Sequence, residues 1–240
     1  MVKKKSKSKR KASLISRIPL RIVRRTLWRY SLIALAIICV IVLAHRSLTP
    51  FDPLYMRQEA TRLGDVDHQW VSIDEIAPVM ARSVVAAEDA NFCLHWGFDV
   101  RAIRDALDDG SNRGASTITQ QVVKNLYLWH GRSWTRKAME ALLTPLVEVF
   151  WSKQRIIEMY LNIAEFDEGV FGVEAASRHY FGVGPESLSD LQAARLAAIL
   201  PAPKIRSASK PNDFVRKRTR QIMDGAATIR RDGRSGCFED

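Results

Sequence analysis

The sequence predicts an all-α protein in which one hydrophobic helix precedes a helical domain. Eight segments with helical periodicity follow one another after residue 78, while strand-like alternation is almost absent. An uncharged, mostly apolar run lies near the N-terminus, from Tyr30 to Ala44. With 240 residues, 47% of them hydrophobic, the chain can build one domain with a substantial core and a short appendage.

The apolar run predicts a membrane-spanning helix at residues 26–46. Tyr30 to Ala44 alone is shorter than the ~20 residues that cross a bilayer, but Leu27, Trp28 and a snorkelling Arg29 extend it. A cleaved signal peptide is the alternative interpretation. The long basic region before the run and the lack of a small-x-small cleavage site after it favour an uncleaved anchor.

The positive charge is concentrated at the N-terminus. Twelve of the 37 Lys and Arg residues lie between Met1 and Arg29, with no acidic residue before Asp52, so the remaining 25 nearly balance the 26 Asp and Glu. A tail of this charge resists translocation, which predicts a cytoplasmic N-terminus and an exported body. The near-neutral body argues against nucleic acid as a partner. The predicted organisation is a cytoplasmic tail (1–25), a span (26–46), a juxtamembrane segment (47–70) and a periplasmic domain (71–235).

Cysteine usage gives no further constraint at this stage. Cys39 lies inside the predicted span, and Cys93 and Cys237 are far apart. An odd, scattered set of this kind predicts neither a disulfide framework nor a metal site.

Each predicted helix of the body has its own signal. Ser72 and Glu75 form a capping-box pattern, and Pro78 restricts the backbone that follows. A mostly apolar segment then ends in two carboxylates. The predicted helices cover residues 79–89, 101–108, 116–129, 135–150, 153–162, 173–181, 189–200 and 212–231.

The first candidate site segment is Glu88-Asp89-Ala90-Asn91-Phe92-Cys93-Leu94-His95-Trp96-Gly97. Two acids at the end of an apolar helix are more often a solvated helix terminus. Here aromatic surface, the His95 ring and a glycine follow directly. Such surroundings can raise the pKa of a carboxylate into the range of a general base, which makes Glu88 the candidate base and gives Asp89 a supporting role.

The second segment runs from Gly114 to Asn125 and is rich in hydrogen-bonding side chains. Ser116 or Thr117 can cap a helix, and Ser116, Gln120 and Lys124 share one face at intervals of four residues. A polar stripe is normally a solvated surface, but this one has hydroxyls and amides in place of the usual Glu and Lys. The open helix N-terminus can meet an anion. The candidate binding residues are Gly114, Ser116, Thr117, Gln120, Gln121, Lys124 and Asn125.

Two further segments add basic residues. Arg132, Arg136 and Lys137 suit a diphosphate, although Arg136 and Glu140 also match an ordinary helix-surface ion pair. The segment from Lys153 to Asn162 has a core face and predicts packing around the site. Pro145 should kink or end the helix at 135–150.

In this order, these segments resemble the peptidoglycan glycosyltransferase family. They match its signatures Glu-Asp-x-x-Phe-x-x-His-x-Gly, Gly-x-Ser-Thr-x-x-Gln-Gln, Arg-Lys-x-x-Glu and a Lys…Tyr-Leu-Asn helix, and the similarity runs from about residue 71 to residue 203. The resemblance implies a lysozyme-like, bilobed all-α fold in the bacterial inner membrane, with the catalytic domain in the periplasm.

The resemblance also implies a reaction. Lipid II would be polymerised from a donor and an acceptor that are both lipid-linked. Glu88 would remove a proton from the 4-hydroxyl of the acceptor, which attacks the anomeric carbon of the donor with inversion and expels polyprenyl diphosphate. Lys124, Arg132, Arg136 and Lys137 would hold the leaving group, with Glu140 as a second catalytic carboxylate. Asp89, Phe92, His95 and Lys153 are expected among the substrate-binding residues. No covalent cofactor is expected, but Mg²⁺ or Mn²⁺ could assist at the diphosphate, and other cell-wall synthesis or division proteins are expected as partners.

A second, penicillin-binding domain is not expected, because its companion motifs and the room for it after residue 203 are both lacking. Two alternatives stay open at this point. A hydrolase of similar fold would use the acid but would not need the basic cluster. A non-enzymatic scaffold of the cell-wall machinery would need neither.

Overall fold

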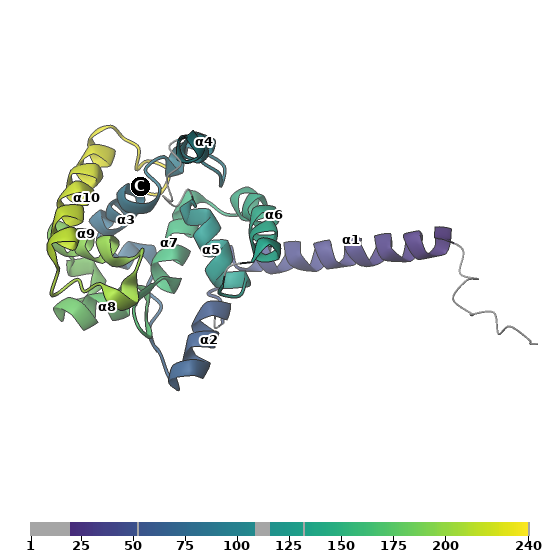
Figure 1. Cartoon of the computed structure of the whole chain (residues 1–240), viewed down its shortest axis with the longest axis horizontal. Coiled ribbons are helices and arrows are strands. Elements are labelled where there is room, and N and C mark those ends of the chain that lie inside the picture. The colour runs from purple at the N-terminus through teal and green to yellow at the C-terminus, as the bar shows by residue number, and fades with distance from the viewer. Residues whose placement is uncertain (1–19, 52, 109–115, 132, 240) are drawn as a thin grey trace, which may run out of the picture. The chain divides into compact units, whose positions relative to one another are not determined.

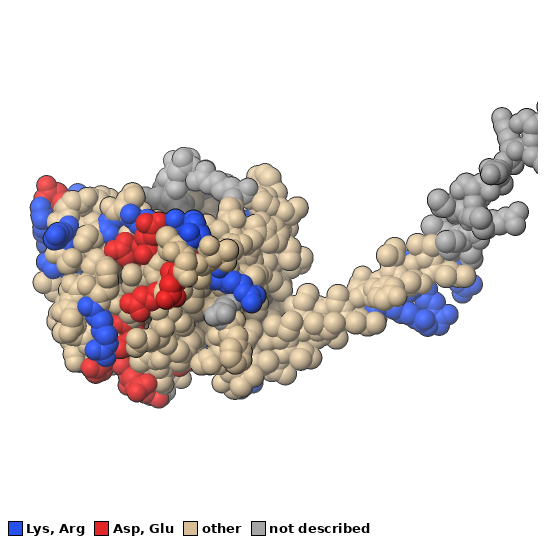
Figure 2. All heavy atoms as spheres, turned by 90° about the horizontal axis from the view of Figure 1, so that it is seen from below, with Lys and Arg blue, Asp and Glu red and all other residues tan. Residues whose placement is uncertain are grey.

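The computed structural model describes residues 20–51, 53–108, 116–131 and 133–239. The chain divides into a part that ends at Ile41 and a compact body that begins at Val42. Helix α1 (Leu20–Ala44) includes a stretch, Arg21–Ala44, that is long and apolar enough to cross a membrane. Its basic side chains gather at its N-terminal end (Figure 2). The helix therefore fits a single-pass membrane anchor, as predicted.

Three helices of the body pack against one another: α3 (Pro78–Glu88), α9 (Asp190–Ile199) and α10 (Asp213–Arg231) (Figure 1). Pro78 occupies the first turn of α3, where its missing N–H is not needed. Val84 and Leu196 are fully buried, and Ile222 almost so. Because α3 is packed on both neighbours, its last residue, Glu88, is set at a fixed place.

A second group of helices packs around α5 (Ile118–Tyr127). It contacts α6 (Trp134–Phe150) and α7 (Lys153–Ile163), and α7 in turn contacts α8 (Gly172–Phe181). The helices α5, α6 and α7 begin at side chains that accept from the backbone N–H three residues on, namely Thr117, Ser133 and Ser152. Each start lies within two residues of the predicted one.

Short elements connect these groups. They are helices α2 (Leu54–Leu63) and α4 (Val100–Asp108), and the 3-10 helices η2 (Ile73–Glu75), η3 (Phe92–Leu94), η4 (Pro185–Ser187) and η5 (Pro203–Ile205). The predicted capping box of Ser72 and Glu75 opens η2. A small sheet has the order β1 (Asp67–His68), β3 (Val170–Phe171), β2 (Glu165–Asp167), parallel between β1 and β3 and antiparallel between β3 and β2. The all-α prediction is confirmed, with this sheet as a minor addition.

The predicted juxtamembrane segment belongs to the compact body. Its helix α2 packs against α5, and Tyr55 and Met56 are buried with Phe171. The sequence did not indicate this helix, because only two of its ten residues are buried and charged residues interrupt its apolar period. The body therefore starts well before residue 71.

Pro145 and the cysteines bear on two other expectations. Of the two outcomes expected at Pro145, a kink or an end of the helix, the end does not occur, since α6 continues to Phe150. The proline is exposed, so the carbonyl that it leaves without a donor, that of exposed Ala141, can bind water. Cys93 and Cys237, which showed no pattern in the sequence, form a disulfide across 144 residues. That pairing depends on tertiary structure, which residue spacing does not reveal.

Candidate active site

Glu88 lies at the C-terminal end of α3 and faces α5. The side-chain amide of Gln121 donates to its carboxylate over 2.8 Å, and Tyr160 donates to the other end of the same amide over 3.3 Å. Burial raises the pKa of Glu88, while the hydrogen bond from Gln121 and the charges of Arg218 and Lys124 oppose that rise. The carboxylate is thus held in place with a raised pKa, as a general base requires.

A cavity of about 370 Å³ lies beside this group, lined by α5, α7, β2, η5 and Tyr55 of α2. Gln121 and Tyr160 form part of its wall, so the cavity is continuous with the residues that hold Glu88. Asn125 also lines it, with a buried side-chain oxygen that has no partner in the described parts of the chain. Buried polar atoms are rarely left unpaired in a folded protein. The orphan oxygen therefore marks the cavity as a place for a polar ligand.

Lys124 lines the same cavity as a partly buried cation. Its ammonium makes no hydrogen bond or ion pair with any residue that the structure describes. Burial lowers its pKa, and the nearby carboxylates of Glu140 and Glu88 oppose that shift. A cation withdrawn from water without a direct partner favours an anionic ligand.

Two more cations lie near Lys124 on α6. Arg136 contacts one carboxylate oxygen of Glu140 at 2.8 Å, and Lys137 contacts the other. The Lys137 ammonium also reaches the Ser116 hydroxyl, at 3.3 Å. Glu140 is almost fully buried, so its carboxylate holds both basic side chains in one orientation. The ion pair considered in the sequence is formed, and the second cation joins it.

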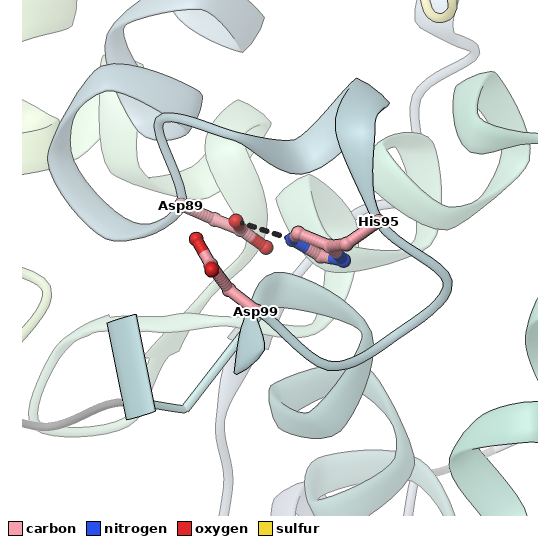
Figure 3. Close-up of side chains that lie close together, drawn as sticks. All are labelled: Asp89, His95 and Asp99. Atoms are coloured by element: carbon pink, nitrogen blue, oxygen red, sulfur yellow. Dashed lines mark hydrogen bonds and ion pairs between the residues drawn. The ribbon is translucent and has the colours of Figure 1, made fainter. Parts of the chain in front are cut away.

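The loop after Glu88 is held by Asp89. The Asp89 carboxylate accepts from the backbone N–H of Ile118 at 3.0 Å and from the His95 ring at 2.8 Å. Figure 3 shows the ring pointing at this carboxylate, with Asp99 alongside. Asp89, His95 and Asp99 could hold a metal ion by composition. The Asp99 oxygens, however, accept from Asn91 and from backbone N–H groups at the start of α4, so hydrogen bonds already satisfy both carboxylates.

Comparison with known proteins places this geometry in a family. A family model described as "Transglycosylase" matches residues 56–227. The chain belongs to the transglycosylase family. A "Biosynthetic peptidoglycan transglycosylase" of Jannaschia sp. (strain CCS1) is 53% identical over 238 residues, 99% of each chain. Proteins of the same name from Caulobacter vibrioides (42%, covering 90% of this chain and 96% of the other) and Pseudomonas fluorescens strain Pf0-1 (55%, covering 64% and 66%) are also similar.

Membership of the transglycosylase family confirms the resemblance inferred from the motifs. It also confirms that the chain is a glycosyltransferase and that its domain has the lysozyme-like, all-helical fold. The family match begins at Met56, inside α2, which agrees with the place of that helix in the body.

Within this transglycosylase, several residues predicted to bind substrate instead contact other protein groups. Phe92 is fully buried against Phe238, and Lys153 lies over its ring at 4.4 Å. The Lys153 ammonium donates to the His95 carbonyl at 2.8 Å and pairs with Glu148 at 2.9 Å. Direct substrate contact was the wrong expectation for Phe92, because no surface of its ring is free. Lys153 and Asp89 likewise have their polar groups engaged by the protein. His95 bonds Asp89 through Nε2, while its buried Nδ1 has no hydrogen-bond partner among the described residues.

The start of α5 confirms one of the two predicted caps. Thr117 is the N-cap and forms a capping box with Gln120, so both side chains are buried and committed to the helix end. Thr117 also donates to the Gly97 carbonyl at 2.7 Å. The helical side that lines the cavity is made of Gln121, Lys124 and Asn125. Of the predicted stripe, Gln120 and Lys124 lie on α5, while Ser116 precedes the N-cap and Gln120 is buried in the capping box. Gly114 and Arg132 lie outside the described residues.

Sequence reasoning missed other residues around the cavity. Tyr55 stacks on His130 at 4.0 Å between ring centroids, and it donates to Glu165. Lys204 pairs with Glu59 at 2.8 Å. These residues come from segments with no motif, and only the fold brings them together. In the sequence, the one available signal was an aromatic residue, Tyr55, in the otherwise polar segment that forms α2.

Proposed function

We propose that this chain polymerises lipid II into linear β-1,4 glycan strands of peptidoglycan. Glu88 takes the proton from the 4-hydroxyl of the acceptor sugar, and that oxygen attacks the anomeric carbon of the donor. The bond from this carbon to the polyprenyl diphosphate breaks with inversion, and the leaving group departs with the bonding electrons. The observation that supports this best is a held carboxylate of raised pKa beside a cavity with an unpaired cation.

The leaving group explains why the cations matter. A diphosphate leaves readily when its developing charge is neutralised, so the reaction needs cations at the donor more than a strong acid. Lys124 supplies an unpaired charge, and Arg136 and Lys137 supply two that Glu140 orients. In this proposal Glu140 orients Arg136 and Lys137 and does not itself contact the substrate, because both of its oxygens are already paired with these two side chains. Arg132 completes the predicted set.

The described carboxylates at and near the cavity do not fit a protein-held divalent cation, because the protein already engages them. Glu165, which lines the cavity, accepts from Tyr55 and from the Gly169 N–H and pairs with Lys204. Glu140 is paired with two basic side chains, and the oxygens of Asp89 and Asp99 accept protein hydrogen bonds. No step here passes through a metal. Mg²⁺ or Mn²⁺ bound to the diphosphate itself stays a prediction, as do protein partners in cell-wall synthesis and division.

We place the body in the periplasm and the basic tail in the cytoplasm. The charge asymmetry around α1 favours this orientation. The disulfide between Cys93 and Cys237 supports it independently, because disulfides persist outside the reducing cytosol. An anchored enzyme of this orientation meets a lipid-linked substrate in the plane of the inner membrane.

Polymerisation of purified lipid II by the full chain in detergent or vesicles tests the proposal. The wild type should produce glycan polymer and release polyprenyl diphosphate, and Glu88→Gln should lower the rate by about 10²-fold or more, because a positioned base contributes that much. Exposed Glu75→Gln is the matched control. Full activity of Glu88→Gln would remove Glu88 as the base. Shortening of finished glycan without precursor would instead indicate the hydrolase.

A further inference from the structure

Residues 232–239, called here the C-terminal brace, lie against the loop that follows Glu88. Cys237 is joined to Cys93 by the disulfide, and the Phe238 ring packs on Phe92 with 6.1 Å between centroids. Phe238 is 3% exposed, so it is part of the core. In Figure 1 the end of the chain marked C lies beside α3.

Polar contacts tie the same two segments together. Arg234 of the brace donates to the Ala90 carbonyl at 3.1 Å. Glu239 receives two hydrogen bonds from one nitrogen of Arg82, at 2.9 and 3.0 Å, and both side chains are mostly buried. The brace therefore holds α3 before Glu88 and the loop after it, and no hydrogen bond or ion pair joins residues 232–239 to Glu88.

These contacts act where the chain needs support. Glu88 is the last residue of α3, and the final turn of a helix frays readily unless its end is held. Two hydrogen bonds from α5 and α7 hold the loop, from the Ile118 N–H to the Asp89 carboxylate and from the Lys153 ammonium to the His95 carbonyl. The brace adds a second set of contacts to the same loop, made by Arg234, Cys237 and Phe238.

The brace is not part of the matched family region. The family match ends at residue 227, five residues before the brace begins. The four signature motifs therefore do not account for it. Cys93, in contrast, lies inside the first motif, at a position where that motif specifies no residue.

We propose that the C-terminal brace is a positioning element for Glu88, and that its Cys93–Cys237 disulfide is required for full catalytic rate. This inference rests on the proposed function for its activity readout, but its structural part does not. Reduction of the bond adds two electrons and two protons from a dithiol, which becomes a cyclic disulfide. The freed loop then holds the base less well, while the cations on α5 and α6 keep their places.

The experiment uses the full chain with Cys39→Ser as the background, because Cys39 is the free cysteine of α1. This protein should show no thiol when denatured and two after reduction. Cys93→Ser/Cys237→Ser in the same background, and the background protein treated with dithiothreitol, should both lose about tenfold in kcat. KM for lipid II and affinity for a diphosphate-mimicking glycolipid inhibitor should change less than twofold, because the cation site is intact.

Hydrogen exchange provides a readout that needs no activity. Amides of residues 87–95 should exchange at least tenfold faster after reduction, with little change in α6. If the double variant does not fold, Phe238→Ala with the disulfide intact takes its place, and Phe238→Leu should restore most of the rate. Unchanged kcat and unchanged exchange after reduction would overturn the proposal, as would two free thiols in the untreated background protein.

The two proposals can fail separately. If the background protein does not polymerise lipid II, the proposed function is wrong, and hydrogen exchange at residues 87–95 still decides whether the brace holds the loop. If polymerisation is normal but does not respond to reduction, the brace has no catalytic role.

Discussion

The Gln121 side-chain amide donates to the Glu88 carboxylate over 2.8 Å, which joins the middle of α5 to the end of α3. A donor to the ionised form favours that form, so this bond restrains the rise in pKa that burial causes. The base therefore has its proton affinity set by two opposed effects, one from packing and one from a single neighbour.

Removing that neighbour should shift the pH profile. Glu88 acts as a base only when deprotonated, so activity falls as the pH drops through its pKa. In Gln121→Ala the hydrogen bond is lost and the pKa rises further, so the acidic limb of kcat against pH should move to higher pH. The same measurement on Gln154→Ala, on a different cavity, should leave the limb in place. A limb that moves to lower pH would contradict this account.

Stability should respond to Glu88 in the opposite sense to activity. Its folded-state pKa is raised, so its contribution to stability is present below the unfolded pKa and is lost as the pH rises through the folded pKa. At neutral pH, Glu88→Gln removes the cost of a buried charge and should melt a few degrees above the wild type. Thermal unfolding at acidic pH, where the carboxyl is neutral in both states, should show the difference shrink. A lower Tm for Glu88→Gln than for the wild type at neutral pH would argue against a Glu88 carboxylate that is destabilised by burial.

Gly97 should be irreplaceable for steric reasons. Its φ is +79°, and an added Cβ would lie 2.4 Å from Thr144 Cγ2. Its carbonyl also accepts from Thr117 at the start of α5. Gly97→Ala should cost about 2–4 kcal/mol, as backbone strain plus overpacking, and lower kcat. Gly182→Ala, at φ +69° with nothing within 4 Å, carries the strain without the clash. Chemical denaturation should separate the two, and equal losses would exclude the steric contact as the cause.

Lys124 should affect the donor diphosphate without supporting the fold. Burial lowers its pKa, and it has no hydrogen-bonded partner among the described residues, so its ammonium contributes little to stability. Lys124→Met should lower kcat/KM by about 10²-fold and leave Tm unchanged or higher. Exposed Lys210→Met is the control. If the Tm of Lys124→Met falls by several degrees, Lys124 has a structural role. If this variant binds the glycolipid inhibitor with wild-type affinity, the diphosphate does not bind at Lys124.

The sequence predicted the long helices because each buries one periodic face, as Val84 and Leu196 show. It also selected Glu88 and Gln121 from two separate motifs and Lys124 from the helix that follows, and the structure joins Glu88 to Gln121 and places Gln121 and Lys124 on one cavity. It did not predict the role of Tyr55 or the pairing of Cys93 with Cys237, because these contacts join residues more than a hundred positions apart. Local pattern carries no information on such pairs. The expectation that Phe92 binds substrate failed for a related reason. A motif position does not reveal whether a side chain faces the core or the solvent.

The exposed face of α6 gives the last prediction. Trp134 is 92% exposed, Leu142 74% and Val149 64%, and their spacing of eight and seven residues puts them on one face. An apolar stripe on a surface helix suits the boundary region of a bilayer. In proteoliposomes, Leu142→Glu/Val149→Glu should raise KM for lipid II several-fold with kcat and Tm near wild type. Phe214→Glu, at an exposed position of α10, should have no such effect. In detergent, where no bilayer has to be entered, the KM difference should disappear; if it persists there, the stripe contacts the substrate itself and not the membrane.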